Sequence, residues 1–191
     1  MNILSIYPYT HISSSALMIK NKIVSASAEE RFNREKFSTK FPSLSSSWCL
    51  KTNKLTWNKI HHIAIPWNPS INLNNVSGRW INDMRWRGEL IPNILGHILR
   101  HLDGKPPLNT ELSFDGRKII FYDHHMCHAA SAFFTSGFSK AHILSIDGHG
   151  ENETCFMGLG VGKKIKKIDS IKYPHSIGLF YGTITDFLGF K

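Results

Sequence analysis

Residues 142–173 read HILSIDGHGENETCFMGLGVGKKIKKIDSIKY, and this stretch decides the expected fold. It predicts a strand, a polar loop, a second strand, a tight GKK turn and a third strand, because β-rich runs alternate with polar, glycine-containing segments. The first strand contains Ile143-Leu144-Ser145-Ile146. The same four residues stand at Ile3-Leu4-Ser5-Ile6, where SALMI and IVSASA follow in the same order. A repeated order of three strands indicates an internal duplication.

The segments between the two repeats alternate between helix and strand patterns. Strand patterns cover 60–67 and 118–123. Helix patterns begin at Pro42 and at His124, an amphipathic helix is expected at 91–102, and a last helix follows Ser176 as its N-cap. Strands that alternate with helices predict an α/β layered domain.

Length and composition limit the possible partners. A chain of 191 residues can form a substantial core, and no apolar run reaches the ~20 residues that span a bilayer. Residues 1–6 lack the features of a signal peptide, so we expect a cytoplasmic protein without a membrane partner. The net charge of +9 favours anionic partners such as nucleotides. Nucleic-acid binding is not expected, because no recognised module accompanies the basic patches. The cysteines form no CxxC pair and are predicted to be free thiols: Cys49, Cys127 and Cys155.

The stretch HHMCHAASAFF at 124–134 suggests a metal site. His124 and His128 are four residues apart, which places them on one face of a helix. Asp147 ends the strand HILSID, and ligand residues in α/β sheets gather at the carboxyl ends of strands. Two imidazoles and a carboxylate suit Fe(II), Mn(II) or Zn(II). The alternative is that His124 and His125 only cap a helix and that Asp147 only closes a turn.

The loop after Asp147 carries Gly148 and Gly150, which allow backbone to approach an anion closely. The same place in the first repeat holds the hydroxyl-rich THISSS at 10–15. Two such loops, related by duplication, predict a nucleotide cleft between two lobes.

Three stretches resemble the N-terminal region of the O-carbamoyltransferases, which include nodulation-factor and antibiotic-tailoring enzymes. They are HHMCHAASAFFTSGF, ILSIDGHGE and YPHSIGLFYGTITDFLGF. The start of the chain is also similar, with EERFNREKF after the third strand. The resemblance covers nearly the whole chain and is weakest from about 68 to 115.

The resemblance implies an actin-like α/β fold of the sugar-kinase, heat-shock ATPase and ribonuclease H type, built from a duplicated βββαβα unit. The first lobe is expected at 1–140 and the beginning of the second at 141–191. Family chemistry forms carbamoyl-adenylate from carbamoyl phosphate and ATP, and the carbamoyl group then passes to a hydroxyl of a small-molecule acceptor. The resemblance assigns His124, His128 and Asp147 as iron ligands. It places His11, a general base or hydrogen-bond donor, and Lys36, which would neutralise phosphate, at the adenylate and acceptor site.

The chain also departs from the family pattern. Tyr7-Pro8-Tyr9 stands where the family has a glycine-rich sequence, and the chain stops at Lys191, where family members continue through the second lobe and a C-terminal domain. The resemblance leaves open whether the missing portion acts in trans, and we expect no carbamoyl transfer from carbamoyl phosphate and ATP by the chain alone. The rival functions are a non-catalytic metal- or nucleotide-binding remnant, a subunit of a split enzyme, and threonylcarbamoyl transfer to tRNA.

Overall fold

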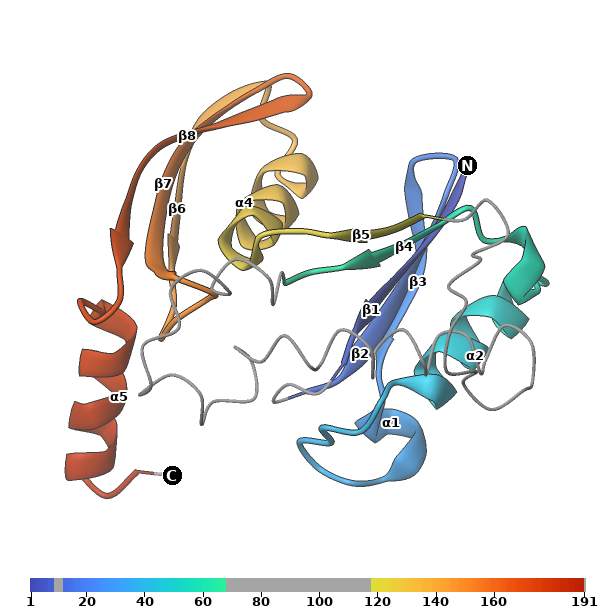
Figure 1. The fold of residues 1–191 in the computed structure, drawn as a ribbon, viewed down its shortest axis with the longest axis horizontal. Coiled ribbons are helices and arrows are strands. Elements are labelled where there is room, and N and C mark those ends of the chain that lie inside the picture. The colour runs from blue at the N-terminus through green and yellow to red at the C-terminus, as the bar shows by residue number, and fades with distance from the viewer. Residues whose placement is uncertain (9–11, 68–117, 191) are drawn as a thin grey trace, which may run out of the picture. The chain divides into compact units, whose positions relative to one another are not determined.

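The computed structural model describes residues 1–8, 12–67 and 118–190 (Figure 1). These residues fall into two compact units, the first ending at Phe121 and the second beginning at Tyr122. The helix expected at 91–102 lies outside the described residues, and the expected lobe boundary after residue 140 stays a prediction. No helix in the described ranges is long and apolar enough to cross a membrane.

The first unit contains a five-stranded sheet in the order β3-β2-β1-β4-β5. Neighbours β1, β2 and β3 are antiparallel, whereas β4 runs parallel to both β1 and β5. This order and these directions are those of an actin-like sheet, which confirms the predicted fold class. Alternate residues of the strands point to one face and form a core that is fully buried, including Leu4, Ile6, Leu17, Ile63 and Ile65. The strand bounds are β1 Asn2–Tyr7, β2 Ser14–Ile19, β3 Lys22–Ala28, β4 His62–Ile65 and β5 Lys118–Phe121.

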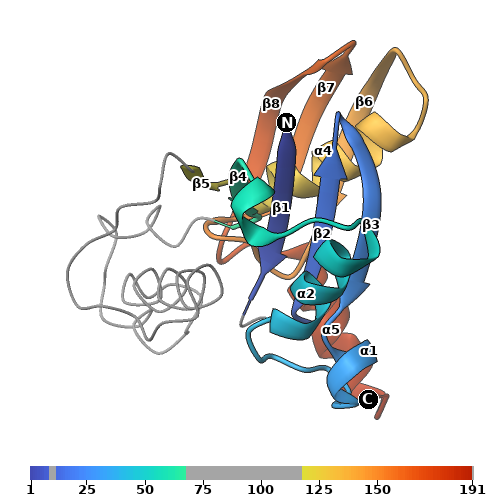
Figure 2. The same cartoon turned by 90° about the vertical axis from the view of Figure 1, so that its right-hand side faces the viewer.

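Helix α2 packs against β2 and β3 in this unit (Figure 2). Its first turn is capped from a distance, because the carboxylate of Glu29 accepts hydrogen bonds from Leu44 N at 3.0 Å and Ser45 N at 2.8 Å. A negative charge at a helix N-terminus is stabilising. Glu29 is only 2% exposed, although it begins the charged run EERFNREK. The helical bounds are α1 Glu30–Asn33, α2 Ser43–Thr52 and the 3-10 turn η1 Trp57–Lys59.

The second unit contains a three-stranded antiparallel sheet, β6-β7-β8, in which the register of β6 and β7 repeats that of β1 and β2. Leu4 pairs with Leu17 in the first meander, and Leu144 pairs with Met157 in the second, so the same 140-residue offset links both members. The strand pairing shifts directly after Leu17 and again directly after Met157. The duplication predicted from ILSI therefore extends to the register of the first strand pair and to the position of a register shift in the second strand. The bounds are β6 Lys140–Ile146, β7 Glu153–Val161 and β8 Lys164–Lys172.

Helix α4, His124–Thr135, packs against β6 and β7 (Figure 1). Its buried side chains, His125, Ala129 and Phe133, recur every four residues and so share one face. Gly160 on β7 allows the close approach, because a Cβ there would lie 2.6 Å from the Phe133 ring. Because this face packs against the sheet, the neighbouring face, which carries the predicted ligands His124 and His128, remains available to bind a metal.

Helix α5, Ile177–Phe187, follows β8, and Ser176 Oγ accepts a hydrogen bond from Leu179 N at 3.0 Å. The prediction of Ser176 as N-cap is therefore confirmed. Several aromatic side chains of α5 are exposed within the described structure, with Phe180 68% and Phe187 85% exposed.

Candidate metal centre

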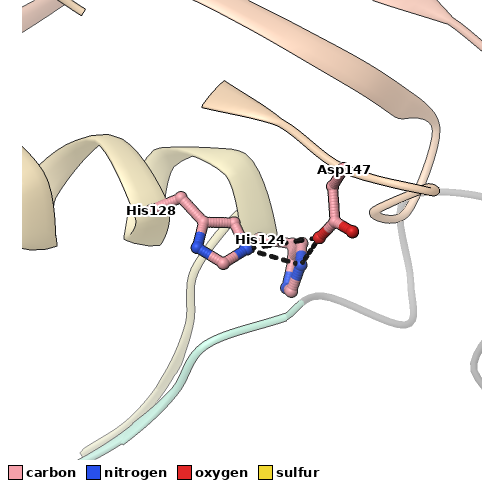
Figure 3. Close-up of side chains that lie close together, drawn as sticks. All are labelled: His124, His128 and Asp147. Atoms are coloured by element: carbon pink, nitrogen blue, oxygen red, sulfur yellow. Dashed lines mark hydrogen bonds and ion pairs between the residues drawn. The ribbon is translucent and has the colours of Figure 1, made fainter. Parts of the chain in front are cut away.

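Three side chains of the second unit converge on one point (Figure 3). His124 and His128 project from the first turns of α4, and Asp147 directly follows β6. Asp147 Oδ2 lies 3.0 Å from His124 Nε2 and 3.3 Å from His128 Nε2. The two imidazole Nε2 atoms are 3.0 Å apart. The structure thus brings together the three residues that spacing and strand position had suggested.

The spacing of these donor atoms suits a single metal ion. For metal–ligand bonds of about 2.1 Å, neighbouring donors lie about 3.0 Å apart in octahedral geometry and about 3.4 Å apart in tetrahedral geometry. The observed separations of 3.0, 3.0 and 3.3 Å fall in this range. Two imidazole nitrogens and one carboxylate oxygen form the 2-His-1-carboxylate set that is typical of non-haem Fe(II), and Mn(II) or Zn(II) also accept such donors. The residues present therefore fit a divalent transition metal.

Asp147 is electrostatically prepared to be a ligand. Hydrogen bonds from His124 and then His128 hold the pKa of Asp147 well below its usual range, and the hydrogen bond from Gly148 N acts in the same direction. Metal ligands must be deprotonated to bind. The Asp147 carboxylate meets this condition throughout the neutral range. The His128 side chain is 49% exposed, so the cluster is open to solvent.

His125 belongs to the core of the unit. It is fully buried, and its Nε2 lies 2.9 Å from Glu153 O while its Nδ1 lies 3.0 Å from Ser145 Oγ. A carbonyl oxygen can only accept, so Nε2 carries the proton and Nδ1 accepts from the serine hydroxyl. Burial lowers the pKa of His125, in agreement with a neutral ring. His125 is therefore a structural residue.

The alternative role of the two histidines as helix caps is not what the structure shows. The N-cap of α4 is Asp123, whose Oδ1 accepts a hydrogen bond from Met126 N at 2.7 Å. Asp147 also makes a contact within its own loop, because its Oδ1 accepts from Gly148 N at 2.6 Å, but its second oxygen faces the histidines.

Gly150 allows the loop to lie against α4. A Cβ at Gly150 would come within 3.0 Å of the His125 ring and 3.2 Å of His124 Cβ. The Gly150 amide donates to Glu153 O at 2.7 Å, and the Gly148 amide donates to Asp147. Both amides are thus engaged within the loop, and the phosphate-binding role of Gly148 and Gly150 stays a prediction.

The start of α5 holds the Asp147 backbone. Ser176 Oγ lies 2.7 Å from Gly148 O and 3.2 Å from Asp147 O. A Cβ at Gly178 would lie 2.3 Å from Asp147 O, so only glycine permits this approach. Helix α5 therefore supports the loop that presents the carboxylate.

The other predicted site residues belong to the first unit. His11 lies outside the described residues. Lys36 is exposed, with its Nζ 5.2 Å from the centroid of the Phe37 ring. Their roles at an adenylate or acceptor site stay predictions.

Sequence reasoning missed several residues that support the cluster. Asp123 could have been found as an N-cap, because it directly precedes the helical stretch. Glu151 was visible only as the last letter of DGHGE, and Gly178 gave no signal. Glu151 is 5% exposed, and its two carboxylate oxygens lie 3.0 and 3.2 Å from His124 N.

The sheet order, the duplicated meander and the histidine–carboxylate cluster define an actin-like α/β protein with a candidate metal centre. Residues 2–191 match the family model described as "Carbamoyltransferase N-terminus". The chain belongs to this family.

Several relatives extend over nearly the whole chain, among them the following two. Protein sll1178 of Synechocystis sp., described as uncharacterized, is 31% identical over 201 residues, which cover 100% of this chain and 32% of the relative. Nodulation protein NolNO of Sinorhizobium fredii is 30% identical over 188 residues, which cover 95% of this chain and 26% of the relative. The chain thus spans about a third or less of the length of these relatives.

Among solved structures, YeaZ from Pseudomonas aeruginosa is similar with a TM-score of 0.46 and 11% sequence identity, over 90% of this chain and 69% of that chain. The fold is assigned from the strand order of the sheet and not from this structural likeness.

Proposed function

We propose that this chain provides the metal-binding part of an O-carbamoyltransferase that acts on carbamoyl-adenylate. The observation that supports this most directly is the convergence of His124, His128 and Asp147 at 3.0 to 3.3 Å in a member of the carbamoyltransferase family. Similarity to a nodulation protein is in agreement with a hydroxyl acceptor, and the acceptor is proposed to be a small molecule.

The proposed reaction is an acyl transfer. The oxygen of the acceptor hydroxyl forms a bond to the carbamoyl carbon of carbamoyl-adenylate. The bond between that carbon and the phosphate oxygen breaks, and AMP leaves with the electron pair. The hydroxyl proton passes to a base, and we assign this role to His11. Carbamoyl phosphate and ATP are the source of the adenylate.

In this proposal His124, His128 and Asp147 hold Fe(II), with Mn(II) or Zn(II) as substitutes. The ion supplies Lewis-acid stabilisation of phosphate charge without a change of oxidation state. Asp147 provides the negative charge of the site. In the metal-free chain, hydrogen bonds from the two imidazoles lower the pKa of Asp147, and with the ion bound their Nε2 atoms would carry no proton. Lys36 is proposed to neutralise phosphate charge, and Gly148 and Gly150 allow the nucleotide to approach the loop.

The test combines metal and nucleotide binding on the whole chain. Mn(II) binding is followed by the loss of the electron paramagnetic resonance signal of the free ion, for the wild type, Asp147→Ala and the control Asp169→Ala. Asp169 is an exposed aspartate on β8 in the same unit. We expect only Asp147→Ala to weaken Mn(II) binding.

The second measurement uses a non-hydrolysable analogue of carbamoyl-adenylate and isothermal titration with and without Mn(II). We expect the analogue to bind only when the metal is present, and to lose binding in Asp147→Ala. Equal Mn(II) affinity in all three proteins would exclude the metal centre. Metal binding without any effect on the analogue would exclude the carbamoyltransferase role while retaining the metal site.

A further inference from the structure

Glu151 connects the two segments that carry the metal-ligand candidates. It lies in the loop that begins with Asp147, and both of its carboxylate oxygens lie within hydrogen-bond distance of His124 N, at 3.0 and 3.2 Å. The side chain is 5% exposed. A buried carboxylate that accepts from a helix N-terminus makes a charge-assisted hydrogen bond and interacts favourably with the helix dipole.

We infer that Glu151 is a positioning residue that locks the His124 end of α4 to the Asp147 loop and so preorganises the three donor atoms. The inference rests on the proposed metal centre for its consequence, but the contact itself is independent of any metal. Glu151 is not one of the three donors, because its carboxylate faces the backbone amide of His124.

A second carboxylate at the same helix end provides an internal comparison. Asp123 also accepts a hydrogen bond from the first turn of α4, from Met126 N at 2.7 Å. Asp123 is the residue that directly precedes the helix, so its bond stabilises α4 without reaching the loop. The Glu151 bond joins α4 to the loop that presents Asp147. Both bonds should affect the stability of the helix, and only the Glu151 bond should affect the distances between donors.

The donor geometry is sensitive to such a connection. The closest donor pairs are 3.0 Å apart, and a binding site must be held within about 0.5 Å of its productive geometry. Gly150 lets the loop lie this close, with the position of its missing Cβ 3.2 Å from His124 Cβ. Without Glu151 the loop loses its hydrogen bonds to the His124 amide.

The test compares Glu151→Ala, Glu151→Gln and Asp123→Ala in the whole chain, with Co(II) as the probe. Outer partners of metal ligands typically change affinity by about 10–100-fold, and we expect a loss of this size in Glu151→Ala. Glu151→Gln keeps an acceptor oxygen and should lose less. Asp123→Ala should lower the thermal midpoint with little change in Co(II) affinity. The visible Co(II) spectrum at saturation should change in Glu151→Ala and not in Asp123→Ala.

A metal-free measurement separates this inference from the metal centre. In the wild type and in Asp123→Ala, the His124 ring and the β protons of Asp147 should give a nuclear Overhauser effect, because His124 Nε2 lies 3.0 Å from Asp147 Oδ2. In Glu151→Ala this signal should weaken, and the amide proton of His124 should exchange faster with solvent. If the alanine variant does not fold, Glu151→Gln should show the same two changes. A wild type that binds no Co(II) but shows these differences would exclude only the metal site. Equal Overhauser signals in all variants, or equal losses of Co(II) affinity in Glu151→Ala and Asp123→Ala, would overturn the positioning role.

Discussion

Replacing His128 by alanine should separate metal binding from folding. The His128 side chain is 49% exposed, so its removal should change the free energy of unfolding by less than about 0.5 kcal/mol. The change leaves only His124 Nε2 and Asp147 Oδ2 as a donor pair, 3.0 Å apart. Loss of a partner outside the metal ligands already costs up to about 100-fold, so loss of a ligand should cost at least about 100-fold, or about 2.7 kcal/mol.

Replacing His125 should have the opposite effect. His125 is fully buried and makes hydrogen bonds with both ring nitrogens. His125→Ala leaves a cavity and removes the partner of a buried carbonyl, which should cost about 2–4 kcal/mol of stability. The affinity of the remaining folded protein for metal should change little. His142, an exposed residue on β6, is the matched control, and His142→Ala should change neither quantity.

Both quantities can be measured on the same proteins. Urea unfolding followed by circular dichroism gives the free energy of unfolding, and Mn(II) titration in native buffer gives the metal affinity of the folded fraction. The reasoning would be refuted if His128→Ala bound Mn(II) like the wild type. It would also be refuted if His125→Ala and His128→Ala lost metal affinity equally while both remained folded.

Three further predictions concern the supports of the fold. Gly178→Ala should lower the thermal midpoint and weaken Mn(II) binding, because its Cβ would lie 2.3 Å from Asp147 O. Gly182→Ala is the control on the same helix: its Cβ meets nothing within 4 Å, and the change should be neutral or stabilise the chain by up to about 1 kcal/mol. Glu29→Gln should lower the free energy of unfolding in urea by about 1–2 kcal/mol, because a buried, charged helix cap is lost. Glu35 is exposed, and Glu35→Gln should change the free energy of unfolding by less than about 0.5 kcal/mol. Burial raises the pKa of the Cys49 thiol, so its labelling by a disulfide reagent at pH 8 should be slow in the native chain and faster at higher pH. Labelling should be fast in urea, and rapid labelling of the native chain would contradict the burial of Cys49.

The sequence predicted the order of elements well where local signals were strong. The β–loop–β–turn–β pattern at both ends of the chain gave two meanders whose strands are the observed ones. Alternation of side chains along a strand and the side-chain oxygen of Ser176 act within a few residues, so they can be read from the sequence alone. The actin-like fold followed from the duplication and the resemblance together.

The sequence also selected the three donor candidates, but it left their convergence open. Spacing placed His124 and His128 on one helix face, and strand position suggested Asp147. Spacing alone could not distinguish His125 as a core residue, because which helix face is buried depends on what packs against it. Here β6 and β7 bury the face of His125, with Gly160 allowing the contact.

The amino-acid sequence by itself determined the periodic features of this protein: the repeated strand order, the helix at 124 and the pair of histidines four residues apart. Only the tertiary structure decided that Asp147 meets these histidines, that Glu151 binds the His124 amide and that Gly178 lies against the backbone of Asp147. The reason is physical. Periodicity and capping depend on torsion angles and contacts within one or two turns of chain. Contacts between distant segments depend on strand register and on how closely two backbones approach, and these are set by the packing of the whole unit.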